Sequence, residues 1–370
     1  MIKNLLVLVV SLGILVALLE GVVFRWLLLP SDLPLLQETT PEKAVLKYIS
    51  NQTGTYRKRD EISAQYSINS NGWNSGRQEY LHPEGVDRRS ICIIGDSYIE
   101  AFQVRFDQSV AERLEGKLKE AGQKVPVFRF GLSGAPLSQY LFILENEVLT
   151  YQPEVVIINL VHNDFHESVQ GTGGSYDRGF SRFAYDQDHK MSITQPAVYE
   201  RDAIWWIKTS ALFRYFRVRQ EVDFTRARKA LVAFFDKGKA DREREVSANI
   251  SLQRGTLDIV EDVTRFAFSR IKALSTEHKF RPIFLVDGDR SEIMSSVNSG
   301  LPSRVKTKEI NELVVKIAND LSLEVIDLWP ILERDYREKR ERLTFEHDGH
   351  WPPHVHDLVA NTLAAVLIDN

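Results

Sequence analysis

The chain has 370 residues, a formal net charge of -4, and 43% hydrophobic and 26% charged residues, which is typical of a globular protein with one large domain or two. Domains that bind nucleic acid are usually clearly basic. The net charge of this chain is close to neutral, so we predict no nucleic-acid partner. The single cysteine, Cys92, excludes an intrachain disulfide, and its place in an apolar run predicts a small side chain inside a buried strand.

An N-terminal membrane anchor is the first predicted element. Residues 5–24 form a mostly apolar run with one ionisable residue, Glu20, and twenty helical residues rise about 30 Å, roughly the hydrocarbon thickness of a bilayer. Lys3 precedes this run and Arg25 follows it, where a long cation can reach the membrane surface. We therefore predict one transmembrane helix within residues 1–30, in which Glu20 pairs with Arg25.

Two other interpretations of this run stay open. A cleaved signal peptide would have a shorter apolar core that ends at an Ala-x-Ala-like site, and no such site is visible. A buried helix of a soluble protein is rarely apolar on every face. The uncleaved anchor agrees best with the sequence, and Trp26 after the run is a residue type that favours the membrane interface.

The segment after the anchor is polar and mixed. It starts with a stiff, proline-containing exit at residues 30–34. We predict that residues 31–88 form an extended lead-in packed on the main domain, residues 89–370.

Strands and helices alternate in the main domain. Short, nearly continuous apolar runs, as in a parallel sheet covered on both faces, predict strands at residues 91–94, 125–130, 155–161, 282–286 and 323–328. Amphipathic patterns predict helices at residues 110–121, 137–149, 257–274, 306–321 and 354–367. This alternation predicts an α/β domain with right-handed crossovers.

Residues 166–250 interrupt the alternation. They are rich in aromatic and charged side chains, including Trp205, Trp206 and the charged run 237–244. We predict an insertion of helices and loops over the carboxyl edge of the sheet. It would line the substrate pocket as a cap, which we favour, or rest on the membrane surface through its Trp and Arg residues.

A candidate nucleophile follows the first predicted strand. Gly95, Asp96 and Ser97 come directly after the apolar run, and a nucleophilic serine needs a tight turn at the carboxyl end of such a strand. Gly95 permits the turn, and the Asp96 carboxylate can accept hydrogen bonds from nearby backbone N–H groups. We predict Ser97 as the nucleophile.

A candidate base lies near the C-terminus. A serine hydroxyl is a poor nucleophile until a base removes its proton, and histidine does this near neutral pH. Only Gly349 separates Asp348 from His350, so one short loop can supply both the base and the carboxylate that orients it.

Two more strand ends can supply oxyanion donors. Gly131 ends the second predicted strand and could offer its backbone N–H, and Asn163 follows the third and could offer its side-chain amide. Such donors typically contribute about 3 to 4 kcal/mol each in the transition state. Because the carboxyl ends of parallel strands share one edge, Ser97, Gly131 and Asn163 are expected to lie together.

This set of residues resembles a known family. The order Gly-Asp-Ser, Gly, Asn-Asp and Asp-x-His is similar to that of the GDSL/SGNH hydrolases, which are serine esterases. The resemblance spans roughly residues 66–360 and implies a three-layer, flavodoxin-like α/β/α domain. It assigns the nucleophile, two oxyanion donors and the acid–base pair to Ser97, Gly131, Asn163, Asp348 and His350.

One further motif, in the lead-in, matches this family, and several other positions differ from its usual sequence. Residues 68–72 resemble the Ile-Asn-Ser-x-Gly lead-in of a membrane-anchored bacterial subgroup. Val161 stands where the family often has a glycine, two residues before the asparagine. The Asp-x-His spacing is shorter than the common Asp-x-x-His, and Pro352 and Val355 replace an asparagine and a glycine of the related Asp-Gly-His-Trp-Asn variant.

A cluster of histidines near the C-terminus is a candidate metal site. His347, His350, His354 and His356 are the residue type that binds zinc. The chain has no second cluster, and His350 already belongs to the serine constellation. We predict neither metal nor cofactor.

The predicted reaction is hydrolysis of an acetyl or short-chain acyl ester on an envelope glycan or lipid. The alternative is an O-acyltransferase acting on a cell-surface polysaccharide, and a third possibility is an anchored, non-catalytic scaffold, against which the complete residue set argues. A short N-terminal tail before the span predicts a cytoplasmic N-terminus and an extracytoplasmic catalytic domain.

Overall fold

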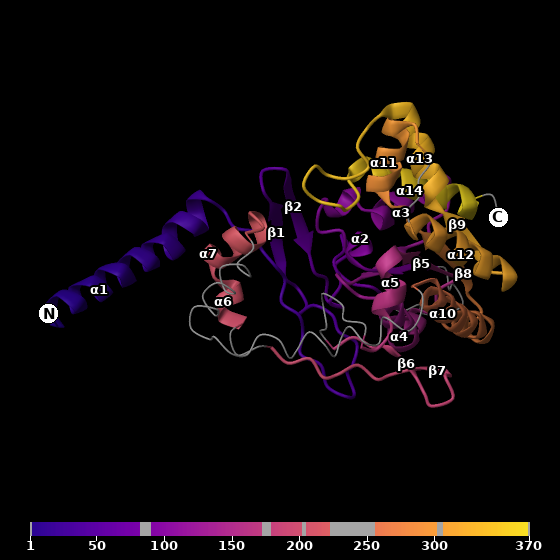
Figure 1. The fold of residues 1–370 in the computed structure, drawn as a ribbon, viewed down its shortest axis with the longest axis horizontal. Coiled ribbons are helices and arrows are strands. Elements are labelled where there is room, and N and C mark those ends of the chain that lie inside the picture. The colour runs from indigo at the N-terminus through magenta and orange to yellow at the C-terminus, as the bar shows by residue number, and fades with distance from the viewer. Residues whose placement is uncertain are drawn as a thin grey trace.

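The computed structural model describes residues 2–81, 90–171, 179–201, 205–222, 256–301 and 306–368. A long N-terminal helix projects from an α/β domain, and the described C-terminal helix lies on the far side of that domain (Figure 1). The charged run 237–244, which we singled out in the sequence, lies outside the described residues.

A five-stranded parallel sheet forms the centre of the domain. Its strands stand in the order β4-β3-β5-β8-β9. Counted along the chain this order is 2-1-3-4-5, which is that of flavodoxin-like folds. The bounds are β3 Ile91–Gly95, β4 Val127–Gly131, β5 Val155–Leu160, β8 Arg281–Val286 and β9 Glu324–Asp327. All five predicted strands are confirmed, and so is the predicted fold class.

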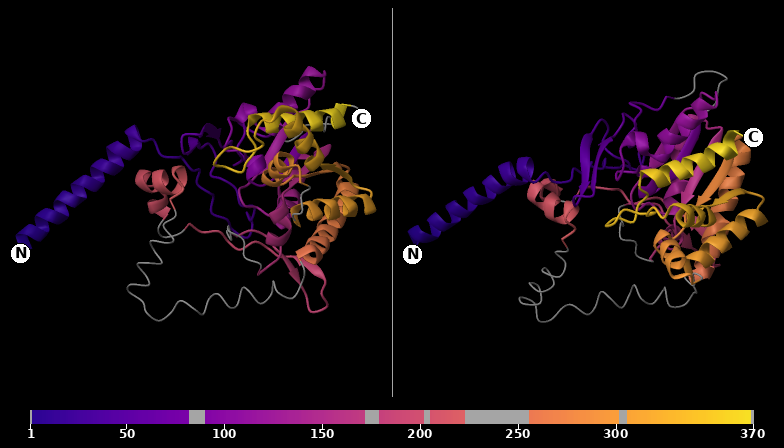
Figure 2. Two further views of the ribbon diagram at one scale, coloured as in Figure 1. Left: turned by 45° about the horizontal axis from the view of Figure 1, so that its top comes forward. Right: turned by 90° about the horizontal axis from the view of Figure 1, so that it is seen from above.

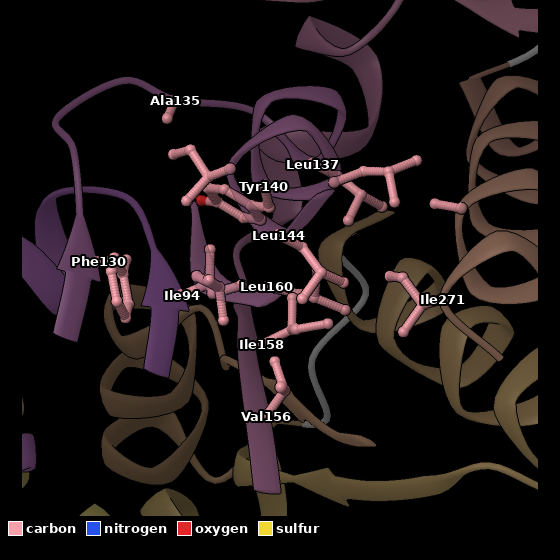
Figure 3. Close-up of a cluster of buried hydrophobic side chains, with 14 of the residues drawn as sticks. Ile94, Phe130, Ala135, Leu137, Tyr140, Leu144, Val156, Ile158, Leu160 and Ile271 are labelled. Atoms are coloured by element: carbon pink, nitrogen blue, oxygen red, sulfur yellow. The ribbon is translucent and has the colours of Figure 1, made fainter. Parts of the chain in front are cut away.

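Helices cover both faces of the sheet. Ile91 and Ile93 of β3 face one helical layer, and Cys92 and Ile94 face the other, because successive strand residues point to opposite faces. The first layer holds α3 Val110–Glu120, α11 Arg290–Ser299, α13 Leu328–Lys339 and α14 Pro353–Ile368. The second holds α4 Leu137–Asn146, α10 Thr256–His278 and α12 Lys306–Asp320. Figure 3 shows part of this second cluster, where Ile94 and Ile158 lie below α4.

The five predicted helices are confirmed, with one difference at α4. That helix ends at Asn146, and a 3-10 helix, η3 Val148–Tyr151, follows it. Helices α11 and α13 were not predicted. Their place is set by packing on the sheet, to which they contribute buried residues such as Ile293 and Leu332.

The lead-in contains a hairpin that the sequence analysis did not predict. Strands β1 Thr53–Lys58 and β2 Ile62–Ser67 pair in an antiparallel manner. Further on, Tyr80 stacks on Phe128 with ring centroids 4.6 Å apart. The Tyr80 hydroxyl lies 3.2 Å from the backbone nitrogen of Arg129 and 3.0 Å from its carbonyl oxygen, and so covers the outer edge of β4.

The N-terminal helix is long and apolar enough to cross a membrane. It consists of α1 Ile2–Leu18 and a π-helical continuation, η1 Leu19–Leu27, and its span by length and composition is Lys3–Leu27. The expected pair of Glu20 and Arg25 is present, with 3.2 Å between their charged atoms. Both views of Figure 2 show this helix projecting away from the domain.

The described part of the predicted insertion lies in two places. A small hairpin, β6 Phe183–Tyr185 and β7 Met191–Ile193, packs near α10. The short helices α6 Trp205–Thr209, α7 Ala211–Arg214 and η4 Tyr215–Arg219 lie beside the end of the N-terminal helix and strand β1 (Figures 1 and 2).

Candidate active site

The predicted nucleophile begins a short helix at the carboxyl end of β3. Helix α2 spans Ser97–Glu100, and the Asp96 carboxylate caps it by accepting a hydrogen bond of 3.0 Å from the Tyr98 N–H. A Cβ on Gly95 would lie 2.4 Å from the Ile99 side chain, so only glycine lets the strand turn this tightly into the helix. Burial raises the pKa of Asp96 to about 6, against the opposing Tyr98 hydrogen bond.

His350 joins the predicted nucleophile to the predicted acid. Its Nε2 lies 2.8 Å from Ser97 Oγ, and its Nδ1 is hydrogen-bonded to Asp348. Asp348 also accepts the backbone N–H of His350 at 2.8 Å, which fixes the two residues in one tight loop. This arrangement can transfer the serine proton to the imidazole while the carboxylate stabilises the resulting positive charge.

Lys58 binds the second oxygen of the Asp348 carboxylate. Its Nζ lies 2.9 Å from Asp348 Oδ2 and 2.7 Å from Glu221. The Asp348 side chain is only 2% exposed. Burial alone would raise the pKa of Asp348, but the hydrogen bonds and charge of His350 and the charge of Lys58 hold it well below its usual range. Lys58 was not predicted from the sequence, because it stands on β1, 290 positions before Asp348.

The turn of the β1–β2 hairpin also supports the loop that carries Asp348 and His350. The Glu61 carboxylate accepts the backbone N–H groups of Glu346 and His347, the latter at 2.9 Å. These two residues come immediately before Asp348. The hairpin therefore holds the loop at two points, through Lys58 and through Glu61.

The opposite side of the same loop is braced by Arg290 and Tyr98. Both donate hydrogen bonds to the Gly349 carbonyl, at 3.1 and 3.2 Å. Arg290 is buried, pairs with Asp287 and lies over the Tyr98 ring at 4.6 Å. A buried guanidinium with this many partners fixes the position of the carbonyl, and the loop is held from both sides.

Asn163 lies at the carboxyl end of β5, beside β3. It is half-buried on α5 His162–Glu167, and no hydrogen bond of its side-chain amide is found within the described residues. The next residue, Asp164, accepts hydrogen bonds from the Val161 N–H at 2.8 Å and the Tyr140 hydroxyl at 3.1 Å, which hold this turn. The Asn163 amide can therefore donate to a bound substrate.

Gly131 has a different place from the one its predicted role requires. The Leu132 N–H points toward β3, where it donates to the Gly95 carbonyl at 3.1 Å, and the Arg129 backbone faces Tyr80 on the outer edge. Because N–H directions alternate along a strand, the Gly131 N–H points with that of Arg129, away from β3. A Cβ here would lie 2.0 Å from the Glu100 nitrogen, so this glycine serves the close approach of α2.

Gly134, three residues further on, offers a better donor. It has a φ of +74° and is half-buried, and its N–H has no hydrogen-bond acceptor in the part of the chain that the structure describes. The turn is attached to α2 through Glu100, whose carboxylate accepts the Ser133 N–H at 3.0 Å and the Ser133 hydroxyl. Burial raises the pKa of Glu100 to about 7, against these hydrogen bonds and that of Tyr48.

Two other histidines of the C-terminal cluster, His354 and His356, have contacts outside the candidate site. His354 lies 3.1 Å from Glu341, and His356 is buried with its ring at the edge of Trp351. Burial lowers the pKa of His356 to about 3. Within the described ranges, no three His, Cys, Asp or Glu side chains are grouped in a way that could hold a metal ion.

Neither a family model nor a curated protein matches this sequence. Among solved structures, it is similar to the acetyl xylan esterase AlAXEase, at 11% identity and a TM-score of 0.41 over 75% of this chain and 99% of that one. It is also similar to a lipase/acylhydrolase from Enterococcus faecalis, at 12% identity and a TM-score of 0.40 over 76% and 96% of the two chains. Likenesses this distant carry no argument about activity, which has to come from the residues of the site.

Proposed function

We propose that this protein is a serine esterase, with Ser97 as nucleophile, His350 as general base and Asp348 as the carboxylate that orients it. The observation that supports this most is the hydrogen bond of 2.8 Å between Ser97 Oγ and His350 Nε2. With Asp348 on the other ring nitrogen, the imidazole has the tautomer in which Nε2 is free to accept the serine proton.

In the proposed reaction, His350 takes the proton of Ser97 while Ser97 Oγ attacks the ester carbonyl. The oxyanion that forms would accept hydrogen bonds from the Asn163 amide and from the backbone N–H groups of Ser97 and Gly134, instead of Gly131. His350 then gives the proton to the leaving alcohol. A water molecule, activated by the same histidine, attacks the acyl-enzyme and releases the acid, so no cofactor is required.

We propose an acetyl or short-chain acyl ester of an envelope glycan or lipid as substrate. The support is the apolar helix Lys3–Leu27, which is suited to hold the site close to a bilayer. We propose a cytoplasmic N-terminus and an extracytoplasmic domain. Reporter fusions after residue 40 and at the C-terminus test this orientation, and a signal only from a cytoplasm-dependent reporter would reverse it.

Hydrolysis of short-chain aryl esters by the purified full-length chain tests the proposed activity. The Ser97→Ala variant should lose about three to six orders of magnitude in kcat, as expected when a triad nucleophile is removed. Ser192→Ala, which changes an exposed serine of β7, is the matched control and should keep full activity. Undiminished hydrolysis by folded Ser97→Ala would overturn the proposal.

A sugar acceptor added to the same assay decides between water and a hydroxyl group as the second substrate. Free acid alone is the expected product of an esterase. Acylated sugar in preference to free acid would instead identify an O-acyltransferase that uses the same Ser97.

A further inference from the structure

The N-terminal helix is exposed up to Leu18 and is partly covered by other parts of the protein after it. The apolar side chains from Leu5 to Leu18 are each about half exposed or more, over most of the 17 residues of α1, which rise about 25 Å. Beyond this point the helix is partly covered by protein. Phe24 is 7% exposed and packs between Tyr215 and Phe216, with ring centroids at 5.2 and 5.4 Å.

Glu20 is the centre of this contact. Its carboxylate accepts the backbone N–H groups of Ala211 and Leu212 at 2.6 and 2.9 Å and the Ser210 hydroxyl at 2.8 Å, in addition to Arg25. The carboxylate thus caps the N-terminus of α7, where a negative charge is most favourable. A carboxylate in an apolar helix is costly unless it is paired, and here the insertion supplies the partners.

The tryptophan side chains differ in exposure between the domain and the region around the anchor. Trp73, Trp329 and Trp351 in the domain are at most 4% exposed. In contrast, Trp26 at the end of the anchor is 73% exposed, and Trp205 and Trp206 on α6 are 42% and 61% exposed. Exposed indoles are unfavourable in water but stable at the boundary between lipid and water, where the ring is buried and its N–H stays hydrated.

We propose that Trp26, Trp205 and Trp206, carried by the anchor end and by α6–α7 docked on Glu20, form a lipid-binding surface at the bilayer interface. This inference uses the membrane anchor of the proposed function but none of its chemistry. The bilayer is the occupant because the surface continues directly from a helix suited to span it.

The same surface is linked to the candidate active site. Arg219 donates to the Leu29 carbonyl at 2.8 Å and to Asp60 at 2.9 Å, and Asp60 is two residues from Lys58, which binds Asp348. From the reach of these side chains, the Asp348 carboxylate lies within about 30 Å of the Leu29 carbonyl. The lipid-binding surface would therefore hold the site close to the bilayer, where an ester in or near the headgroup region can reach it.

Depth-dependent quenching in vesicles tests this surface directly. Cys92 is fully buried, so a cysteine introduced as Trp206→Cys can be labelled selectively with a nitrobenzoxadiazole fluorophore. The matched control is Leu301→Cys, at an apolar residue that is 68% exposed and follows the end of α11 by two positions. Both full-length chains are reconstituted into phosphatidylcholine–phosphatidylglycerol vesicles with and without nitroxide-labelled lipid.

The fluorophore at position 206 should be quenched several-fold more strongly than the one at 301, and its emission should shift to the blue. Trp205→Cys should behave in the same way, which covers a folding defect of either variant. Equal quenching at 206, 205 and 301 would overturn the inference. The measurement is made in the Ser97→Ala background, so its outcome is independent of whether the chain hydrolyses esters.

Discussion

At the scale of single residues, Lys58 is the side chain that sets the charge balance around Asp348 and His350. The second oxygen of the Asp348 carboxylate is occupied by an ammonium group, so part of the charge that would stabilise a protonated His350 is already neutralised. Burial alone would lower the pKa of Lys58, but the hydrogen bonds and charges of Glu221 and Asp348 raise it above its usual value. Lys58 therefore stays protonated around neutral pH.

Replacing Lys58 should shift the pH dependence of hydrolysis. In Lys58→Gln the charge of Asp348 is no longer compensated, and it stabilises the protonated form of the imidazole. Because only the neutral imidazole acts as base, the acid limb of the kcat/KM profile should move up by about 0.5 to 1 pH unit. Lys58→Arg keeps the charge and should leave the limb in place. A lower rate in Lys58→Gln with an unmoved limb would contradict this electrostatic role.

At the scale of elements, the β1–β2 hairpin is a support for the loop that carries Asp348 and His350. Glu61→Ala removes the acceptor for two backbone N–H groups next to Asp348 but leaves Lys58 unchanged. We expect kcat to fall about three- to tenfold through loss of positioning, with the acid limb unmoved. Glu120→Ala, on the exposed end of α3, is the control, and equal rates in the two variants would argue against the support.

The hairpin also marks where sequence-based prediction reached its limit. The central strands were predictable because nearly continuous apolar runs, such as residues 155–161, are buried on both faces. Strand β1, Thr53–Lys58, is polar and none of its residues is fully buried, so it carries no periodic signal. Helix α11 has only three buried residues in ten, and its place depends on the sheet that it covers.

The residues of the candidate site also differ in whether the sequence predicted them. Ser97, Asp348 and His350 stand in short motifs next to glycines, so local sequence indicated them, and the structure brings all three within hydrogen-bonding distance. Lys58 and Arg290 contact the loop from distant parts of the chain, and no local sequence pattern predicts such contacts. For Gly131, the local pattern indicated a glycine with a special role, but the direction of its backbone N–H follows only from the pairing of β4 in the sheet.

At the scale of the whole molecule, the parallel sheet and the anchor together define the candidate site. Ser97 and Asn163 follow β3 and β5, two adjacent strands between which the chain order reverses, and open α/β sheets bind their ligands at this crevice. The contacts of Glu20 and Arg219 join the anchor to the insertion and the hairpin. A single connected set of contacts thus extends from the proposed membrane surface to the carboxylate of Asp348.

The central claim is that Ser97 is a nucleophile activated by His350, and active-site labelling tests it most directly. The full-length chain, treated with a fluorophosphonate at neutral pH and digested, should give one stoichiometric adduct on Ser97 by mass spectrometry. The adduct should be absent from Ser97→Ala, should form far more slowly in His350→Ala, and should form at the normal rate in His347→Ala. An unlabelled Ser97 in the folded chain, or an adduct on another serine, would contradict the account.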